Sequence, residues 1–161
     1  MAWCWICERW IQVSKFVKGD AELIRKLRTI KGVVGGGMGQ VALAGAFRLE
    51  GIVKQSMNQT HSGRSYRRGG KLHVASAPGE APAIDYGHLL NSLGSSILES
   101  DGNSATAQLG TNAEYAAPLE FGSAHTAARP FMRPAADEHG DDVSRAMSAT
   151  AVRLVKQAGG S

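Results

Sequence analysis

Residues 93–109 have the sequence LGSSILESDGNSATAQL, and this stretch decides the fold class. Apolar and polar residues alternate on both sides of Asp101-Gly102, a dipeptide that favours the tight turn of a β-hairpin. The alternation runs from Leu93 to Glu99 before the turn and from Ala105 to Leu109 after it. We therefore predict two antiparallel strands joined at residues 100–103.

Helical periodicity surrounds this predicted hairpin, because apolar residues recur at intervals of three and four. The predicted helices cover residues 20–31, 40–58 and 87–93, and a long C-terminal helix begins near Arg133. Residues 35–39, Gly-Gly-Gly-Met-Gly, separate the first two. Since consecutive glycines lose much backbone entropy in a helix, we predict a flexible link there. The sum is an α+β fold: an antiparallel sheet with a central hairpin packs against a helix pair from the N-terminal half and one long C-terminal helix.

The predicted C-terminal helix has a clear apolar side and an acidic start. Asp137, Glu138, Asp141 and Asp142 lie early in it, where the helix dipole favours negative charge, and Gly140 is expected to mark a kink. The apolar stripe is formed by Val143, Met147, Thr150, Leu154 and Ala158. A metal-binding patch is the alternative interpretation of the acidic residues, but a solvated helix start needs no further assumption.

A chain of 161 residues is long enough for one domain with a single core. We expect residues 1–14 to form an N-terminal arm and residues 15–161 to form one α+β domain with a long basic loop at 60–84. Cys4-x-x-Cys7 lies in the arm without a second pair of metal ligands, so two reduced thiols of a cytosolic protein are expected. Glu8 and Arg9 interrupt the apolar run there, which argues against a signal peptide.

No constellation for catalysis is evident. The five histidines are scattered singly, and neither a Gly-x-Ser-x-Gly nor a His-Glu-x-x-His motif occurs. We therefore expect no catalytic residue, no metal and no cofactor, and a protein that is not an enzyme.

Charge is divided unevenly along the chain. The net charge is +4, but residues 1–84 hold 13 basic and 5 acidic side chains and residues 85–161 hold 5 basic and 9 acidic. Opposite poles of this kind suit head-to-tail association of copies. Residues 64–71 concentrate positive charge around an aromatic ring, a pattern that can combine phosphate contacts with base stacking. A charge run is more often a solvated loop, and contact with DNA or with an acidic protein surface is the alternative. The residues of this candidate contact are Arg64, Tyr66, Arg67, Arg68 and Lys71.

Three segments, taken in order, resemble a known family. They are residues 62–69 with 75–82, residues 85–93, and Tyr-Ala-Ala-Pro-Leu-Glu-Phe-Gly at 115–122 with Ala-Arg-Pro-Phe-Met-Arg-Pro-Ala at 128–135. The chain resembles the neck, head–tail joining, tail-completion or minor tail proteins of long-tailed double-stranded-DNA bacteriophages over about residues 16–157. Tyr86 departs from the family pattern, which has Thr in an Asp-Thr-Gly turn.

This resemblance implies a structural virion protein that forms part of a ring between the DNA-filled head and the tail. It implies as partners further copies of the chain, in a hexamer or dodecamer, and adjacent connector, tail-terminator or tail-tube proteins, with non-specific contact to passing DNA. It also implies a place in the virion after a period in the host cytoplasm. No membrane partner is expected, because no apolar run approaches the roughly 18 residues that a membrane span needs. The alternative is a DNA-binding accessory protein that uses the basic segment 64–71.

The third segment carries the candidate subunit contact, and its residue types also suit core and turn architecture. We expect Tyr115 and Phe121 to anchor the sheet to the last helix, and Gly122 to adopt a positive φ. Glu120 is expected at an exposed rim or paired with a cation. Pro130 is expected to fix the approach to the helix and Pro134 to lie in its first turn. The candidate contact residues are Tyr115, Glu120, Phe121, Gly122, Pro130, Phe131 and Pro134.

Overall fold

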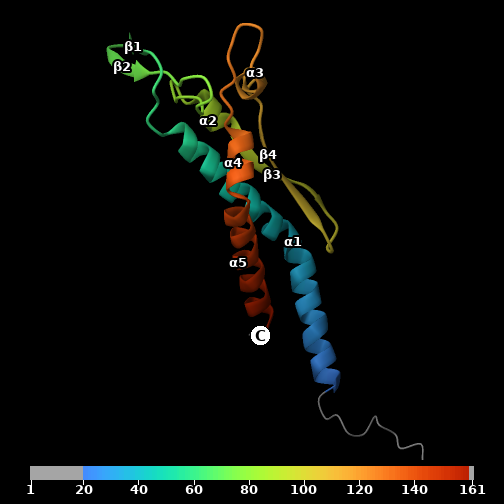
Figure 1. The fold of residues 1–161 in the computed structure, drawn as a ribbon. Coiled ribbons are helices and arrows are strands. Elements are labelled where there is room, and N and C mark those ends of the chain that lie inside the picture. The colour runs from blue at the N-terminus through green and yellow to red at the C-terminus, as the bar shows by residue number, and fades with distance from the viewer. Residues whose placement is uncertain (1–19, 160–161) are drawn as a thin grey trace, which may run out of the picture.

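One helix of 38 residues, α1 (Asp20–Met57), runs through most of the length of the molecule (Figure 1). The structure is a computed structural model that describes residues 20–159, so the predicted N-terminal arm lies outside the described residues. The fold is α+β, as predicted, but the helix pair expected in the N-terminal half is a single helix.

The predicted link at residues 35–39 is wrong because its glycines let two neighbours approach the backbone of α1. A Cβ at Gly35 would lie 2.7 Å from the carbonyl oxygen of Gly102, and one at Gly37 would lie 2.5 Å from Cδ1 of Leu154. Each glycine lowers the stability of the helix by about 1 kcal/mol relative to alanine, and the tertiary packing against the glycines offsets this cost. The glycines therefore allow neighbouring segments to approach the backbone of one continuous helix, and they do not separate two helices.

The central hairpin forms as predicted. Strand β3 (Leu93–Ser100) pairs antiparallel with β4 (Ala105–Thr111), and the register places Ile97 opposite Ala107 with a bulge between Ile97 and Glu99. The sheet has only these two strands, and it packs along α1, where the Glu50 carboxylate accepts a hydrogen bond of 2.7 Å from the Ser95 hydroxyl. The short helix α2 (His88–Ser92) precedes β3, in agreement with the sequence prediction.

Part of the predicted loop at 60–84 is a second hairpin, which holds the basic segment, while residues 75–84 contain no helix or strand. Strand β1 (Ser65–Arg68) pairs antiparallel with β2 (Lys71–Val74), and Gly69 and Gly70 turn the chain with φ of 54° and 81°. These positive φ values explain the Gly-Gly pair, because other residues adopt them only at a cost.

Three helices complete the fold: α3 (Ala116–Phe121), which the sequence did not predict, α4 (Met132–Glu138) and α5 (Gly140–Gly159). The expected single C-terminal helix breaks at His139, one residue before the glycine expected to kink it. Helix α5 packs antiparallel along α1, since Asp142 meets Arg48, Met147 meets Gly45 and Leu154 meets Gly37. The predicted apolar stripe of this helix therefore faces α1.

The main core lies where the C-terminal part of α1 meets α2, β3, α3 and α4. Phe131, Met57 and Val53 are its largest fully buried side chains. The cluster consists of Ile52, Val53, Met57, Leu89, Leu93, Ala116, Phe131 and Ala135. This core holds the third resembling segment in place, and it leaves the first third of α1 outside.

Candidate functional site

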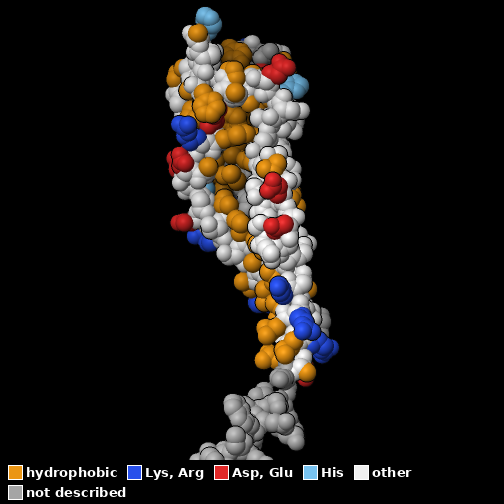
Figure 2. All heavy atoms as spheres, turned by 90° about the vertical axis from the view of Figure 1, so that its right-hand side faces the viewer, with side chains coloured by type: hydrophobic (Ala, Val, Ile, Leu, Met, Phe, Trp, Pro, Cys, Tyr) orange, Lys and Arg blue, Asp and Glu red, His pale blue; other side chains and the backbone are white. Residues whose placement is uncertain are grey.

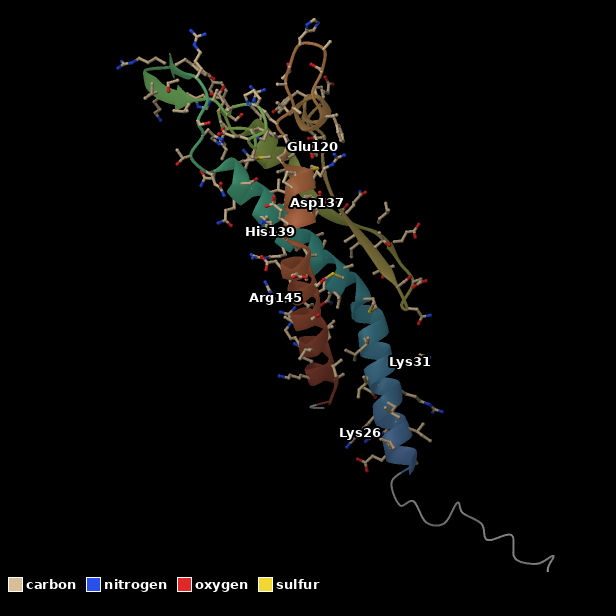
Figure 3. All side chains as sticks on the ribbon, viewed as in Figure 1. Lys26, Lys31, Glu120, Asp137, His139 and Arg145 are labelled. Atoms are coloured by element: carbon tan, nitrogen blue, oxygen red, sulfur yellow. The ribbon has the colours of Figure 1, made fainter. Side chains whose placement is uncertain are left out.

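Glu120 organises the segment from α3 to α4. Its carboxylate accepts hydrogen bonds from the backbone N–H groups of Phe131 at 2.8 Å, Met132 at 3.0 Å and Arg133 at 2.9 Å (Figure 3). These are N–H groups at the start of α4, which the helix itself leaves without partners and whose dipole favours a carboxylate. The expectation that Glu120 lies at an exposed rim or pairs with a cation is therefore wrong, because this half-buried side chain caps a helix across a loop.

Gly122 closes this loop with φ of 81°, so the expected positive φ is confirmed. A Cβ there would lie 3.2 Å from the backbone nitrogen of Ala128, which leaves little room for a side chain. Across the same loop the Arg129 N–H donates to the Leu119 carbonyl at 2.6 Å, and the Arg129 guanidinium donates to the Ser76 carbonyl at 3.2 Å. Pro130 enters α4 and Pro134 lies in its first turn, as expected.

The aromatic residues of the segment divide between core and surface. Phe131 is 2 % exposed and anchors α4, whereas Tyr115 is 47 % and Phe121 71 % exposed. The predicted anchoring role of Tyr115 and Phe121 is therefore wrong, and Phe131 has that role instead. The guanidinium of Arg133 lies 5.9 Å from the centre of the exposed Phe121 ring, a cation–π contact at the surface.

An apolar groove of about 520 Å³ lies between the end of β4, α3 and α4. We call it the α3–α4 groove. Its lining comprises Gly110, Thr111, Ala113, Ala116, Ala117, Glu120, Phe121, Phe131, Met132, Arg133 and Ala136. Figure 2 shows a stripe of apolar side chains along this face of the molecule, with acidic side chains on both sides of it. Exposed apolar surface of this kind is a usual mark of a protein contact.

The first turns of α1 form a second apolar surface, on which Leu23 and Leu27 are exposed and Ile30 is half-buried. Leu23, Leu27 and Ile30 recur at intervals of four and three, and the same face continues to Gly37 and Gly45, which α5 covers. Leu154 lies against Gly37 and α5 ends five residues later at Gly159, so the cover by α5 runs out near residue 32, about half a turn before Ile30. We call residues 20–31 the α1 overhang.

The sequence singled out these apolar residues as a helix face without assigning them a function. The signal that would have found the overhang is the difference in length between two packed helices, 38 residues against 20. That signal was hidden because the glycine run was interpreted as the end of the first helix.

The basic candidate residues lie on the β1–β2 hairpin, but they do not form one patch. Tyr66 is paired with His73, and their rings meet edge to face with centres 5.1 Å apart. Arg67 is paired with Leu72, and because adjacent strand residues point to opposite faces, Arg67 lies on the other face from Tyr66. Arg64, Arg67 and Lys71 are exposed and form no ion pair with another described residue. The backbone of Arg68 pairs with that of Lys71 at the turn.

Glu80 fastens the base of this hairpin. Its carboxylate accepts hydrogen bonds from the hydroxyl and the backbone N–H of Ser62, before β1, and from the N–H of Ala77, after β2. These bonds, with the Ser62 hydroxyl contributing most, lower the pKa of Glu80 from its ordinary 4.5 to about 2. Nδ1 of His61 lies 3.7 Å from the same carboxylate.

The titratable side chains of His61 and Glu80 bind backbone groups and are not free for chemistry. Both line a cavity of about 380 Å³ beside α4. A ring nitrogen of His61 lies 3.1 Å from the Met57 carbonyl oxygen, and the Glu80 carboxylate accepts the hydrogen bonds at the base of the β1–β2 hairpin. Within residues 20–159 no three His, Cys, Asp or Glu side chains gather closely enough to hold a metal ion. Cys4 and Cys7 lie outside the described residues. None of the helices described combines the length and hydropathy that a membrane span needs.

Comparison of the chain with protein-family models, with curated proteins and with solved structures gives no match.

Proposed function

We propose that this chain is a structural protein of a bacteriophage neck, one component of a ring that joins the DNA-filled head to the tail. It acts through protein–protein contacts and without catalysis. Its neighbours in the virion are further copies of itself and connector, tail-terminator or tail-tube proteins, which it meets after folding in the host cytoplasm.

The observation that carries this proposal is the α1 overhang. Leu23 and Leu27 are 57 % and 55 % exposed on a helix that continues beyond α5 and the β3–β4 hairpin, which pack against it. Because an isolated helical stretch of this length is marginal in water, its apolar face is best explained by a neighbour that covers it in an assembly.

Two further features support the proposal. The resembling segment at 115–135 forms one unit, in which Glu120 and Gly122 close the loop between α3 and α4. The charge division between the two parts of the chain, +8 for residues 1–84 against −4 for residues 85–161, suits contact between unlike surfaces of successive copies.

The direct test is a nonsense codon at Gln40 in the gene of the phage that carries this chain. The expected result is an accumulation of filled heads and free tails in electron micrographs, with joining restored by the wild-type chain supplied in trans. Infectious particles of normal morphology in the absence of the chain would refute the proposal. Mass spectrometry of purified virions provides an independent readout, since the chain must then be a particle component.

A DNA-binding accessory protein is the second candidate, and the β1–β2 hairpin favours it. The hairpin exposes Arg64, Arg67 and Lys71 without acidic partners among the described residues, and its base is fastened by Glu80. Cations presented in this way can neutralise DNA phosphates without reading sequence.

Salt dependence tests this second function. About four phosphate contacts would give a slope near −3.6 in a plot of log affinity against log salt concentration. Replacing the four hairpin cations, Arg64, Arg67, Arg68 and Lys71, by Ser should remove that slope. The matched control replaces the four cations of the overhang, Arg25, Lys26, Arg28 and Lys31, by Ser. Equal losses in both variants would show that only net charge attracts the DNA and that the hairpin is not a binding site.

A further inference from the structure

We infer that the α1 overhang of one copy docks into the α3–α4 groove of the next copy, so that successive chains associate head to tail. The overhang supplies the exposed Leu23 and Leu27 and the half-buried Ile30, and the groove receives them beside Phe121 and Met132. This deepens the proposed function, on which it rests for the setting in which copies meet, by naming the contact.

The overhang has the form of a helical ligand. Leu23, Leu27 and Ile30 follow the i, i+4, i+7 spacing by which an amphipathic helix fills an apolar groove. The stripe continues the face that α5 already covers, so the helix has one apolar side along its length and a partner for only part of it. A second helix-binding surface is therefore required, and residues 32–159 provide none at that end of α1.

The groove has the form of a receptor. Small side chains, Ala113, Ala117 and Ala136, line it and leave room for larger ones. Phe121 is the most exposed of the large apolar side chains in the part of the chain that the structure describes, at 71 %. Glu120 is the acidic residue in the lining, and its carboxylate already accepts hydrogen bonds from the N–H groups at the start of α4. Docking therefore does not bury a carboxylate that lacks hydrogen-bond donors.

The exposed charges that flank the two surfaces are mostly opposite, although the groove lining also holds one cation, Arg133, whose guanidinium lies 5.9 Å from the centre of the Phe121 ring. Arg25, Arg28 and Lys31 flank the stripe of the overhang, and within the described residues none of them has an ion-pair partner. Glu114 and Asp137, each next to a lining residue of the groove, are exposed and likewise unpaired among residues 20–159. Figure 3 labels Asp137 on α4 and Lys31 on α1 far from one another in the same chain. Complementary charge at such rims chiefly directs encounter and orientation.

The placement of the surfaces determines the symmetry. The overhang is at one end of the molecule and α3 with α4 is toward the other (Figure 1), so a chain cannot fill its own groove. Two different surfaces that complement each other give a heterologous contact, which closes into a ring when the rotation between copies allows it. A contact of three apolar side chains is small, and it gains strength when several copies are held together.

Disulfide mapping between two different variants tests this contact. Both chains carry Cys4→Ser and Cys7→Ser, which removes the two native cysteines. One chain also carries Leu27→Cys and the other carries Ala136→Cys in the groove. The control partner carries Val152→Cys on α5, where the side chain is 52 % exposed, close to the 55 % of Leu27. Circular dichroism of each variant verifies that it is folded before mixing.

We expect the 27–136 cross-link to form at least about tenfold faster than the 27–152 cross-link, because docking raises the local concentration of the first pair of thiols. Arg28→Glu with Lys31→Glu in the first chain should remove most of that advantage. Equal rates for both partners, a dominant 27–27 cross-link, or no 27–136 product at protein concentrations up to about 1 mM would overturn the inference. Because this assay uses only the purified chain, the cross-link can fail while the neck function stands, or succeed while the nonsense mutant still assembles.

Discussion

The substitution of neighbouring glycines in the middle of α1 gives the sharpest test of the fold. Gly35 and Gly36 lie side by side in the same helix, yet a Cβ at Gly36 would meet nothing within 4 Å, whereas one at Gly35 would lie 2.7 Å from the carbonyl oxygen of Gly102. Gly36→Ala should therefore gain only the helix propensity of alanine, about 0.5–1 kcal/mol of unfolding free energy.

Gly35→Ala gains the same propensity but forces a backbone contact apart. Ordinary contact begins at 3.4 Å, so the turn of the β3–β4 hairpin or the helix must move by several tenths of an ångström. Such overpacking costs about 1–3 kcal/mol, which leaves a net change between zero and a loss of about 2.5 kcal/mol. The two variants should then differ by about 1–3 kcal/mol, or roughly 2–12 °C in Tm for a chain of this size.

Thermal and urea unfolding followed by far-ultraviolet circular dichroism measure this difference. A Gly35→Ala variant stabilised as much as Gly36→Ala would refute the close approach of the hairpin turn to α1. A Gly36→Ala variant that gains no stability would refute the continuous helix itself and return residues 35–39 to the role of a link.

The remaining predictions concern two carboxylates and the glycine segment. Glu120→Ala leaves three N–H groups of α4 without their acceptor and should cost about 1–3 kcal/mol in urea unfolding, against less than about 0.5 kcal/mol for the exposed Glu114→Ala; equal losses would contradict the capping role. The folded-state pKa of Glu80 is lowered to about 2, so its stabilisation is complete above the ordinary value of 4.5 and is lost as pH falls from there toward 2. Hydrogen exchange of the β1–β2 amides, corrected for the intrinsic rate, should accelerate over that range in the wild type and show no such step in Glu80→Gln. The amides of residues 35–39 should be protected, and exchange there as fast as in an unfolded peptide would exclude the helical segment.

Local chemistry predicted the elements that local interactions determine. The β3–β4 hairpin follows from alternation around Asp101-Gly102, and the Asp101 carboxylate accepts hydrogen bonds from the N–H groups of Asn103 and Ser104, which holds the turn. The positive φ of Gly122 and the place of Pro134 likewise follow from what those residues can adopt.

The errors arose where distant segments decide the outcome. No rule based on neighbouring residues can reveal that the carbonyl of Gly102 and the side chain of Leu154 need the space that Gly35 and Gly37 leave free. The same holds for Glu120, whose partners are 11 to 13 residues away across a loop. Phe121 and Phe131 are indistinguishable by residue type, and only the packed core separates the exposed ring from the buried one.

The continuity of α1 has a mechanical consequence. At about 1.5 Å per residue, its 38 residues make a rod roughly 57 Å long that connects the overhang at one end with the approach to the β1–β2 hairpin at the other. The glycines near its middle are the part of the helix that bends most easily, and α5 and the β3–β4 turn pack against that part and support it. A force that separates α5 or the β3–β4 turn from α1 would let α1 bend at the glycines. Tension at one end of the molecule would then be relieved without disturbing the contacts at the other.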